Sequence, residues 1–406
     1  MAKRQRLSTY QLDDLPDEVI LKILDFLDLK ERLLCGQVSK RLRAIANDES
    51  LWLKVNLYER KVPYDFIEKA VGNGCQYLSL VGCDILSLTG KSELSFNLKF
   101  LNLYGGCQGV QKLVQNCSSL QKLSVAWLTL DSDDIQYVCQ SGQTLQVLDL
   151  EECHFDLHNL TESLTGLFTN CAHLTELNIG DNELLDPHIQ ALVDNLTPTI
   201  LKVNLNRRVN LKIEHVKTLV RRCNNITHLD LRRTFLTNDA VHSIIKYLRT
   251  SMEKLDVSDT EVNFATLLQL KSMPALKTLI CFYLHNGGDH AEDIKNLKQH
   301  LPHVSVNDEK YFLIASPLKK KNECISYLVF GNQWIWEIRA KEQNLFAKQH
   351  RKMLTKNEES LLRIPTDQYN TVDILERTQF RLRNDLMAAI KNRARKIWKK
   401  RINIGP

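Results

Sequence analysis

Apolar residues recur along the middle of the chain in a fixed string, apolar-x-x-apolar-x-apolar. Successive copies begin 22 to 29 residues apart. A period of this length predicts a repeat architecture, in which each unit buries its apolar side only by stacking on its neighbours. The first apolar residues of the ten copies are Cys75, Leu98, Leu120, Leu145, Leu174, Ile200, Ile226, Met252, Leu276 and Leu301.

Each unit is predicted to contain one strand and one helix. In the fourth copy Leu148 and Leu150 alternate with polar residues, which predicts a short strand with both leucines inward and with Asp149 and Glu151 outward. Residues 215–223 instead have apolar residues at helical spacing. The period and the alternation are those of leucine-rich repeats, so we expect an α/β solenoid with a curved parallel sheet inside and helices outside.

The N-terminal segment follows a different pattern. An amphipathic helix is predicted after Pro16, with acidic residues in its first turn. A second apolar pattern runs from Leu33 to Ile45, and a third short segment runs from Asp48 to Trp52. Three short helices bury little by themselves, so we expect some of their apolar residues to contact another protein or the first repeat.

Charge divides the chain into two unlike parts. Residues 310–406 hold 21 lysines and arginines against 9 acidic residues, whereas residues 1–309 hold 33 against 39. The apolar runs are too short to span a membrane and no secretory leader is evident, so we expect neither a membrane protein nor a secreted one. The basic end and the segment Lys3 to Arg6 suggest nuclear import, and we expect the nucleus and the cytoplasm.

The cysteines and histidines do not form a ligand pattern. There are 11 cysteines, none in a CxxC pair, and no HExxH motif occurs. Cys117, Cys171 and Cys223 each lie three residues before a repeat begins, which predicts buried packing rather than redox chemistry. No nucleophile constellation or phosphate-binding loop occurs either, so we expect no metal, no cofactor and no catalysis.

Three segments of the N-terminal part carry a specific resemblance. They are LPDEVILKIL (15–24), VSKRLRAIA (38–46) and DESLW (48–52). In this order and spacing they resemble an F-box, which implies docking on a Skp-family adaptor and, through it, on a cullin and a RING subunit. The alternative is a small helical bundle that caps the solenoid. An F-box followed by leucine-rich repeats resembles the non-catalytic substrate receptors of SCF-type ubiquitin ligases.

The later repeats narrow this resemblance. Residues 203–231, 273–280, 297–307 and 314–317 resemble the S-phase kinase-associated type of F-box receptor. That type implies phosphorylated CDK inhibitors of the Cip/Kip class as substrates, marked for proteasomal degradation in the cell cycle, and a small CDK-associated accessory subunit as a further partner.

Apolar anchors are implied for the adaptor interface, and we expect about half of them to hold the F-box together instead. These residues are Leu15, Pro16, Val19, Ile20, Ile23, Leu24, Leu27 and Trp52.

The natural substrate site of a solenoid is its strand surface. Repeats six to eight present Asn204, Asn206, Asp230, Arg232, Asp256 and Ser258 there, next to Arg207, Arg208, Arg233 and Asp259. A basic cluster would suit a phosphorylated or acidic peptide, and a solvated polar surface is the alternative. The residues assigned to substrate or accessory protein are Arg208, Arg232, Arg233, Asp259, Asn307 and Tyr311.

The resemblance both supports and complicates this assignment. Arg208 falls on an arginine of the family's substrate surface. Arg233 falls where the family has an acid and Asp259 where it has an arginine, an exchange that would keep an ion pair between repeats. Asp181 and Tyr311 replace a tryptophan and a phenylalanine of the family.

The expected domains are an F-box (9–56), a linker with the first helix (57–74), the repeats (75–309), a segment that folds back on the repeats (310–345) and a basic helical extension (346–406). A scaffold that binds nucleic acid through the basic extension, or an SCF receptor for clients outside the cell cycle, would fit the same sequence.

Overall fold

The computed structural model describes residues 15–86, 95–105, 113–156, 158–207, 210–284 and 290–307. These residues form two compact units. One contains residues 15–55 and 72–75, and the other contains residues 56–71 and 76–307. The expected segments 310–345 and 346–406 and the stretch Lys3 to Arg6 lie outside the described residues.

The first unit is built from short helices, as the sequence predicts. They are α1 (Asp17–Asp25), α2 (Leu29–Cys35), α3 (Lys40–Ala46) and α4 (Glu49–Trp52). The second apolar pattern forms two helices rather than one, so the described part of this unit has four. The reason is Ser39, whose hydroxyl accepts a hydrogen bond from the backbone N–H of Leu42 at 3.1 Å and so begins α3 anew.

Two side chains tie these helices together. The indole Nε1 of Trp52 donates to the carbonyl oxygen of Ala46 at 2.8 Å inside the unit. The guanidinium of Arg41 donates to the carboxylate of Asp17 and to the carbonyl oxygen of Leu15, both at 2.7 Å. Arg41 therefore fixes the beginning of α1 against α3.

The main sheet has eleven strands, and ten of them lie wholly in the second unit. From β3 onward the strands pair in parallel with their neighbours, and they correspond one to one to the ten predicted repeats. In sheet order they are β1 (Lys54–Tyr58), β3 (Tyr77–Val81), β5 (Phe100–Asn102), β6 (Lys122–Ser124), β8 (Val147–Asp149), β10 (Glu176–Asn178), β11 (Lys202–Asn204), β12 (His228–Asp230), β13 (Lys254–Asp256), β14 (Thr278–Ile280) and β15 (Ser305–Val306). Two small sheets pair β2 (Lys61–Pro63) with β4 (Asp84–Leu86) and β7 (Thr129–Leu130) with β9 (His154–Phe155).

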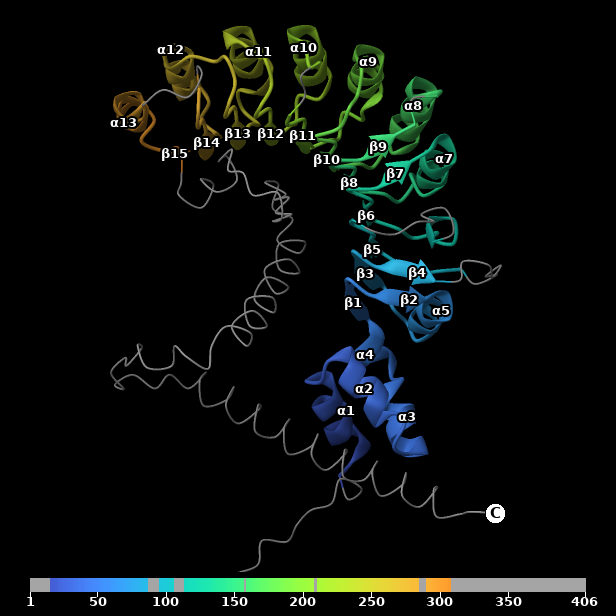
Figure 1. Ribbon diagram of the computed structural model, residues 1–406. Helices are drawn as coiled ribbons and strands as arrows, with labels where there is room; N and C mark the ends of the chain where they lie inside the picture. Colours follow the sequence, from blue (N-terminus) through green and yellow to red (C-terminus); the bar gives the residue numbers. More distant parts are fainter. Residues whose placement is uncertain are drawn as a thin grey trace, which may run out of the picture. The chain divides into compact units, whose positions relative to one another are not determined.

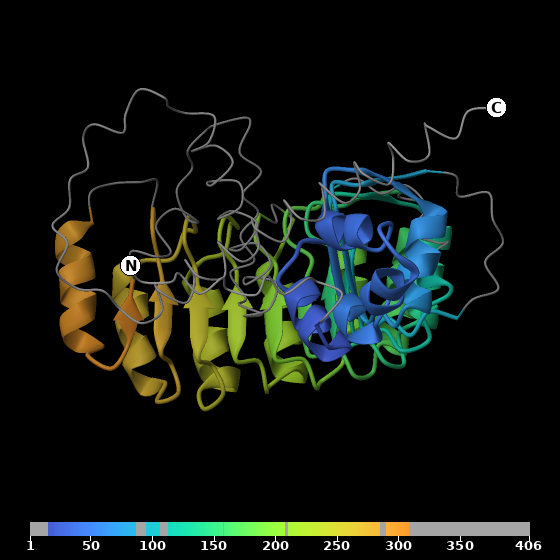
Figure 2. The same ribbon diagram turned by 90° about the horizontal axis from the view of Figure 1, so that it is seen from below.

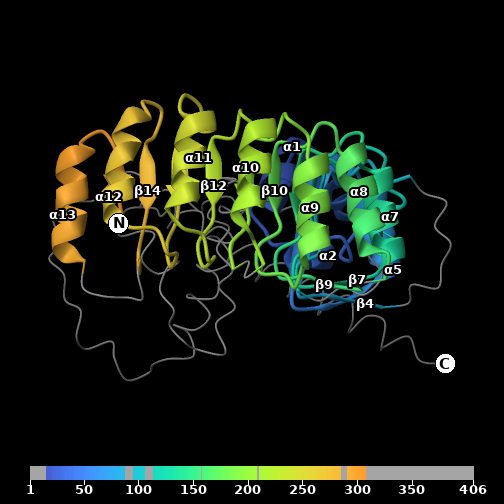
Figure 3. The ribbon, with the colours of Figure 1, turned by 90° about the horizontal axis from the view of Figure 1, so that it is seen from above.

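Helices cover the outer side of this sheet. They are α5 (Tyr64–Gly72), α7 (Ser132–Gln140), α8 (Leu160–Asn170), α9 (Asp186–Asn195), α10 (Ile213–Arg222), α11 (Asn238–Leu248), α12 (Phe264–Leu267), the 3₁₀ helix η2 (Leu268–Ser272) and α13 (Ala291–His300). Figure 1 shows the strands on the inner side of the curve and the helices outside. Seen from above, α9 to α13 lie side by side along the outer side (Figure 3). None of the helices in the described ranges is long and apolar enough to cross a membrane.

The apolar string forms the core of the solenoid. All ten first apolar residues are at most 1% exposed. The cysteines that precede repeats are buried with them, which confirms the packing prediction, and burial raises the pKa of Cys117 and Cys171 to about 12. Such thiols stay protonated and unreactive at neutral pH.

Six strands of the main sheet end in a buried asparagine or aspartate. Its side-chain oxygen accepts a hydrogen bond from the backbone N–H two residues later, at 2.9 to 3.3 Å. This local turn satisfies a backbone donor where the strand stops. The residues are Asn102, Asp149, Asn178, Asn204, Asp230 and Asp256, and with Ser124 of β6 we call them the inner column.

This burial corrects one expectation. Asp149 and Glu151 lie on the side opposite the core leucines, as predicted, but they are only 2% and 5% exposed rather than solvated. Parallel strands lie about 4.8 Å apart, so each polar side chain is covered by those of the neighbouring repeats. Figure 2 shows the strands of successive repeats standing side by side.

A left-handed residue follows each turn. Seven residues after the first apolar position, nine repeats have a positive φ, and only two of them use glycine there, Gly82 and Gly105. The other seven, which we call the edge row, are Trp127, Glu152, Asp181, Arg207, Arg233, Asp259 and Tyr283, with φ between 54° and 65°. A side chain in this conformation costs about 1 kcal/mol relative to glycine. The fold imposes the backbone geometry, and the sequence places large polar and aromatic side chains on it.

Two glycines provide a matched test of the close contact between repeats. A Cβ on Gly180 would lie 2.7 Å from Nδ2 of Asn206 in the next repeat, whereas a Cβ on Gly166 in α8 would meet nothing within 4 Å. We expect Gly180→Ala to lower the free energy of unfolding by about 1–3 kcal/mol, because a buried amide must move. Gly166→Ala should raise it by about 0.5–1 kcal/mol through helix propensity. Urea denaturation followed by circular dichroism measures both, and equal effects would contradict the close packing at Gly180.

Candidate functional site

The predicted adaptor residues divide into two groups. Ile20, Leu24, Leu27 and Trp52 are buried within the first unit. Leu15 and Ile23 are half-buried, and Pro16 and Val19 are exposed. The expectation that about half of them hold the F-box together agrees with this division.

The exposed members share one side of α1. Pro16, Val19, Ile23 and Phe26 are three or four residues apart, so they form a single apolar stripe, which we call the F-box stripe. Val19 is 40% and Phe26 59% exposed. Leu34 of α2 is also exposed. Phe26 and Leu34 were missed by the sequence reasoning, although the spacing of seven residues from Val19 to Phe26 is a helical repeat of the same face.

The inner column links neighbouring repeats through hydrogen bonds. The hydroxyl of Ser124 donates to Oδ2 of Asp149 at 2.8 Å, and Nδ2 of Asn178 donates to Oδ1 of the same carboxylate at 2.9 Å. Within repeat six, Nδ2 of Asn206 donates to Oδ1 of Asn204 at 2.9 Å. The first two contacts join strands β6, β8 and β10, so the polar side chains of these strands form a connected layer on the inner surface.

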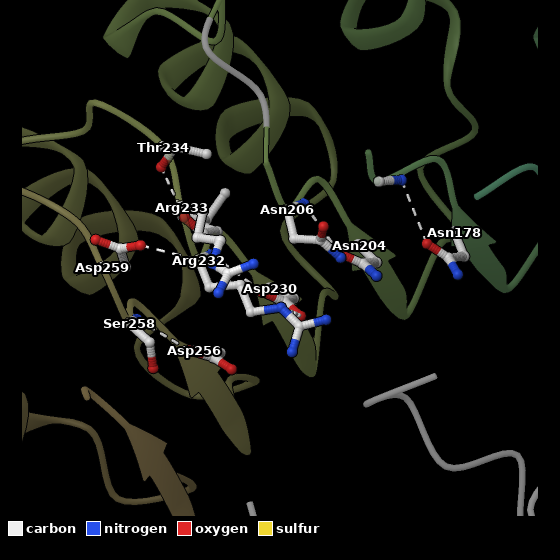
Figure 4. A network of polar contacts seen from close by, with 12 residues as sticks. Asn178, Asn204, Asn206, Asp230, Arg232, Arg233, Thr234, Asp256, Ser258 and Asp259 are labelled. Carbon is white, nitrogen blue, oxygen red and sulfur yellow. Dashed lines mark hydrogen bonds and ion pairs between the residues drawn. The ribbon is translucent and has the colours of Figure 1, made fainter. Parts of the chain in front are cut away.

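Arg232 lies inside this layer beside two acids. Asp230 and Asp256 are fully buried, and Nε of Arg232 is 3.4 Å from Oδ2 of Asp230 (Figure 4). Burial raises the pKa of both carboxyl groups, and the charge of Arg232 opposes that rise. Arg232 itself is only 9% exposed, so it is a buried counter-ion rather than the solvent-facing cation that the sequence suggested.

The edge row carries two further ion pairs. Arg207 pairs with Asp181, and Nε of Arg233 lies 3.5 Å from Oδ2 of Asp259 (Figure 4). The second pair is the contact between repeats that the exchanged charges predict. The three described arginines of the predicted basic cluster therefore each face a carboxylate. Burial, and then the positive charges of Arg207 and Arg232, lower the pKa of Arg233. The three arginines therefore still repel one another, and in this sense they are crowded.

The remaining predicted substrate residues have different positions. Asn307 has a φ of 50°, and its Oδ1 accepts a hydrogen bond from the backbone N–H of Cys281 at 2.8 Å, so it completes the last turn of the sheet. Arg208 and Tyr311 lie outside the described residues.

The structure offers no metal centre in the parts of the chain that it describes. His228 lies on β12 between Lys202 and Lys254 of the adjacent strands. Burial, and then these two lysines, lower its pKa to about 4. The imidazole is therefore neutral at physiological pH.

Comparison with protein families identifies both parts of the chain. Residues 12–58 match the F-box-like family, and residues 67–343 match the SKP2 LRR domain, which is more than half of the chain. The fold and these matches define an F-box protein with leucine-rich repeats. The chain belongs to the family with the SKP2 LRR domain.

Individual relatives are distant. F-box/LRR-repeat protein 21 of Bos taurus is 20% identical over 291 residues, which are 67% of this chain and 60% of that protein. The chain thus spans about three fifths of the length of this relative. F-box only protein 15 of Bos taurus is 46% identical over 44 residues, 11% of this chain and 9% of that protein. Among solved structures, the Rad7 and Elc1 complex in yeast has a TM-score of 0.45 and 14% identity, covering 71% of this chain and 87% of that one.

The two arginines next to each other in the sequence provide a test of the polar layer. We expect Arg232→Gln to lower the free energy of unfolding by about 3 kcal/mol or more, because it leaves Asp230 and Asp256 buried without their counter-ion. Arg233→Gln removes a partly exposed pair and should cost less than about 1 kcal/mol. Thermal and urea unfolding of both variants gives the comparison, and a larger loss from Arg233→Gln would refute the assignment of the buried counter-ion.

Proposed function

We propose that this chain is the substrate-recognition subunit of an SCF-type E3 ubiquitin ligase. In this role the F-box binds a Skp-family adaptor, and through it a cullin and a RING subunit, while the repeats hold the substrate. The chain itself is non-catalytic. Tethering raises the effective concentration of substrate lysines near the charged E2, and this proximity is its whole contribution.

The observation that carries the proposal is the F-box stripe, which lies in the segment that matches the F-box-like family. Exposed apolar side chains on one helix face, such as Val19 and Phe26, bury readily against a partner and are typical of interface anchors. The buried members Ile20, Leu24 and Trp52 hold the helices that present them.

We propose that the client is a phosphorylated protein of the Cip/Kip class. The repeats would bind it together with the CDK-associated accessory subunit, as part of cell-cycle control. The support is the resemblance of repeats six to ten and the crowding of Arg207, Arg232 and Arg233, since an anion beside them would relieve their mutual repulsion. The same role suggests that the ligase acts in the nucleus and the cytoplasm and that its client is degraded by the proteasome.

Substitution on the stripe tests the adaptor interface. We expect Val19→Lys combined with Phe26→Lys to weaken binding of the purified Skp-family adaptor at least a hundredfold, because two charges would have to be desolvated in an apolar interface. Ala44→Lys, on an exposed position of α3, is the control and should change the affinity little. Surface plasmon resonance measures all three proteins, and circular dichroism verifies their folding. Unchanged binding of the double variant would overturn the adaptor proposal.

A phosphothreonine peptide from a Cip/Kip inhibitor tests the client separately. With the accessory subunit present, we expect Arg233→Gln and Arg208→Gln each to weaken binding about fivefold or more, because a charge-assisted hydrogen bond is lost. Lys217→Gln on the outer helix α10 removes the same charge elsewhere and is the control. Fluorescence anisotropy gives the affinities. If phosphorylation of the peptide makes no difference, the ligase serves another class of client.

A further inference from the structure

The first half of the edge row has a different character from the second. In the second half, repeats six to eight place the ion-paired residues Arg207, Arg233 and Asp259 on the edge row. In the first half, repeats three and four place Trp127 and Glu152 on the edge row, and neither belongs to the ion pairs described above. This part lies outside the surface proposed for the phosphorylated client.

Trp127 presents an aromatic ring to solvent from an unusual backbone. Its φ is 65°, at the position where Gly82 and Gly105 occur in the first two repeats, and the side chain is 36% exposed. Its ring centroid lies 5.9 Å from that of Tyr104 in the preceding repeat, and the two planes are tilted by 42°. Two rings from adjacent repeats thus form one aromatic surface at the edge of the sheet.

A carboxylate without a counter-ion lies next along the row. Glu152 occupies the same position one repeat later, and among the described residues no lysine, arginine or histidine lies within ion-pair distance of it. Burial, and then the charge of Asp181, raise its pKa to about 7, while Arg207 lowers it. Arg207 is already paired with Asp181. The charged form of Glu152 would therefore gain from a cation supplied from outside.

Backbone hydrogen bonds hold these residues in place. The N–H of Trp127 donates to the carbonyl oxygen of Glu151 at 2.9 Å, and the N–H of Glu152 donates to that of Gly180 at 3.0 Å. The Trp127 and Glu152 backbones are fixed before any partner arrives, so little backbone entropy is lost on binding. Trp127 and Glu152 occupy equivalent positions in adjacent repeats, so the aromatic surface and the carboxylate are neighbours along the edge row. Aromatic faces attract a cationic side chain through their quadrupoles, and the carboxylate adds a charge partner.

We propose that Tyr104, Trp127 and Glu152 form a second protein-binding surface that receives a lysine or arginine side chain of a partner protein. The charged head lies over the aromatic rings and pairs with Glu152. This surface acts independently of the F-box stripe and of the crowded arginines, so it adds a contact for a basic segment of a client or of another subunit.

Peptide selection on the full-length protein tests this surface. A library of 12-residue peptides is selected on the wild type after depletion on Trp127→Gly, a variant that removes the ring and suits the left-handed backbone. We expect the enriched peptides to share a lysine or arginine. Exchange of that residue for norleucine or citrulline should weaken binding about tenfold, and Glu152→Gln about fivefold.

Tyr283→Gly is the matched control, because it removes an aromatic ring from the same position six repeats later. It should change the affinity less than twofold. Enrichment of no peptide, of peptides without a cation, or of peptides that bind Trp127→Gly as well as the wild type would each overturn the proposal. Adaptor binding, measured on the same variants, reports on the ligase assignment alone, so failure of one proposal is distinguished from failure of the other.

Discussion

The buried Asn or Asp at the end of six strands of the main sheet is the constraint on which the repeat surface depends. Residues such as Asp149 and Asp230 terminate their strands by accepting a backbone hydrogen bond two residues on. The turn that follows forces the chain into the left-handed region at a fixed position. Seven of the nine described positions carry a side chain at the same edge of the sheet, and the other two are Gly82 and Gly105.

On this surface, burial decides which charged side chains face solvent and which are paired inside the protein. A row of arginines in the sequence suggests a basic patch, yet Arg232 is held between buried acids and Arg233 faces Asp259. One section of the surface differs from another in the charges that act on its side chains. Glu152 belongs to no ion pair among the described residues, whereas Arg207 and Arg233 repel each other. Net charge alone would not separate these sections.

The F-box and the solenoid use apolar residues in opposite ways. In the repeats every member of the apolar string is buried, because stacked neighbours cover it on both sides. In the F-box four short helices bury Ile20 and Leu24 but leave Val19 and Phe26 uncovered. A unit this small cannot hide all its apolar surface, and the excess is available to a partner.

The sequence by itself determined the number of repeats, the strand and helix of each, the buried cysteines and the F-box, because apolar periodicity and capping residues act over a few positions. It also indicated the pair between Arg233 and Asp259. Only the tertiary structure decided that Asp149 and Arg232 are buried, that Phe26 is exposed and that the rings of Trp127 and Tyr104 lie side by side. Those outcomes depend on which residues of neighbouring repeats and helices lie alongside one another, and contacts between residues more than twenty positions apart leave no local pattern in the chain.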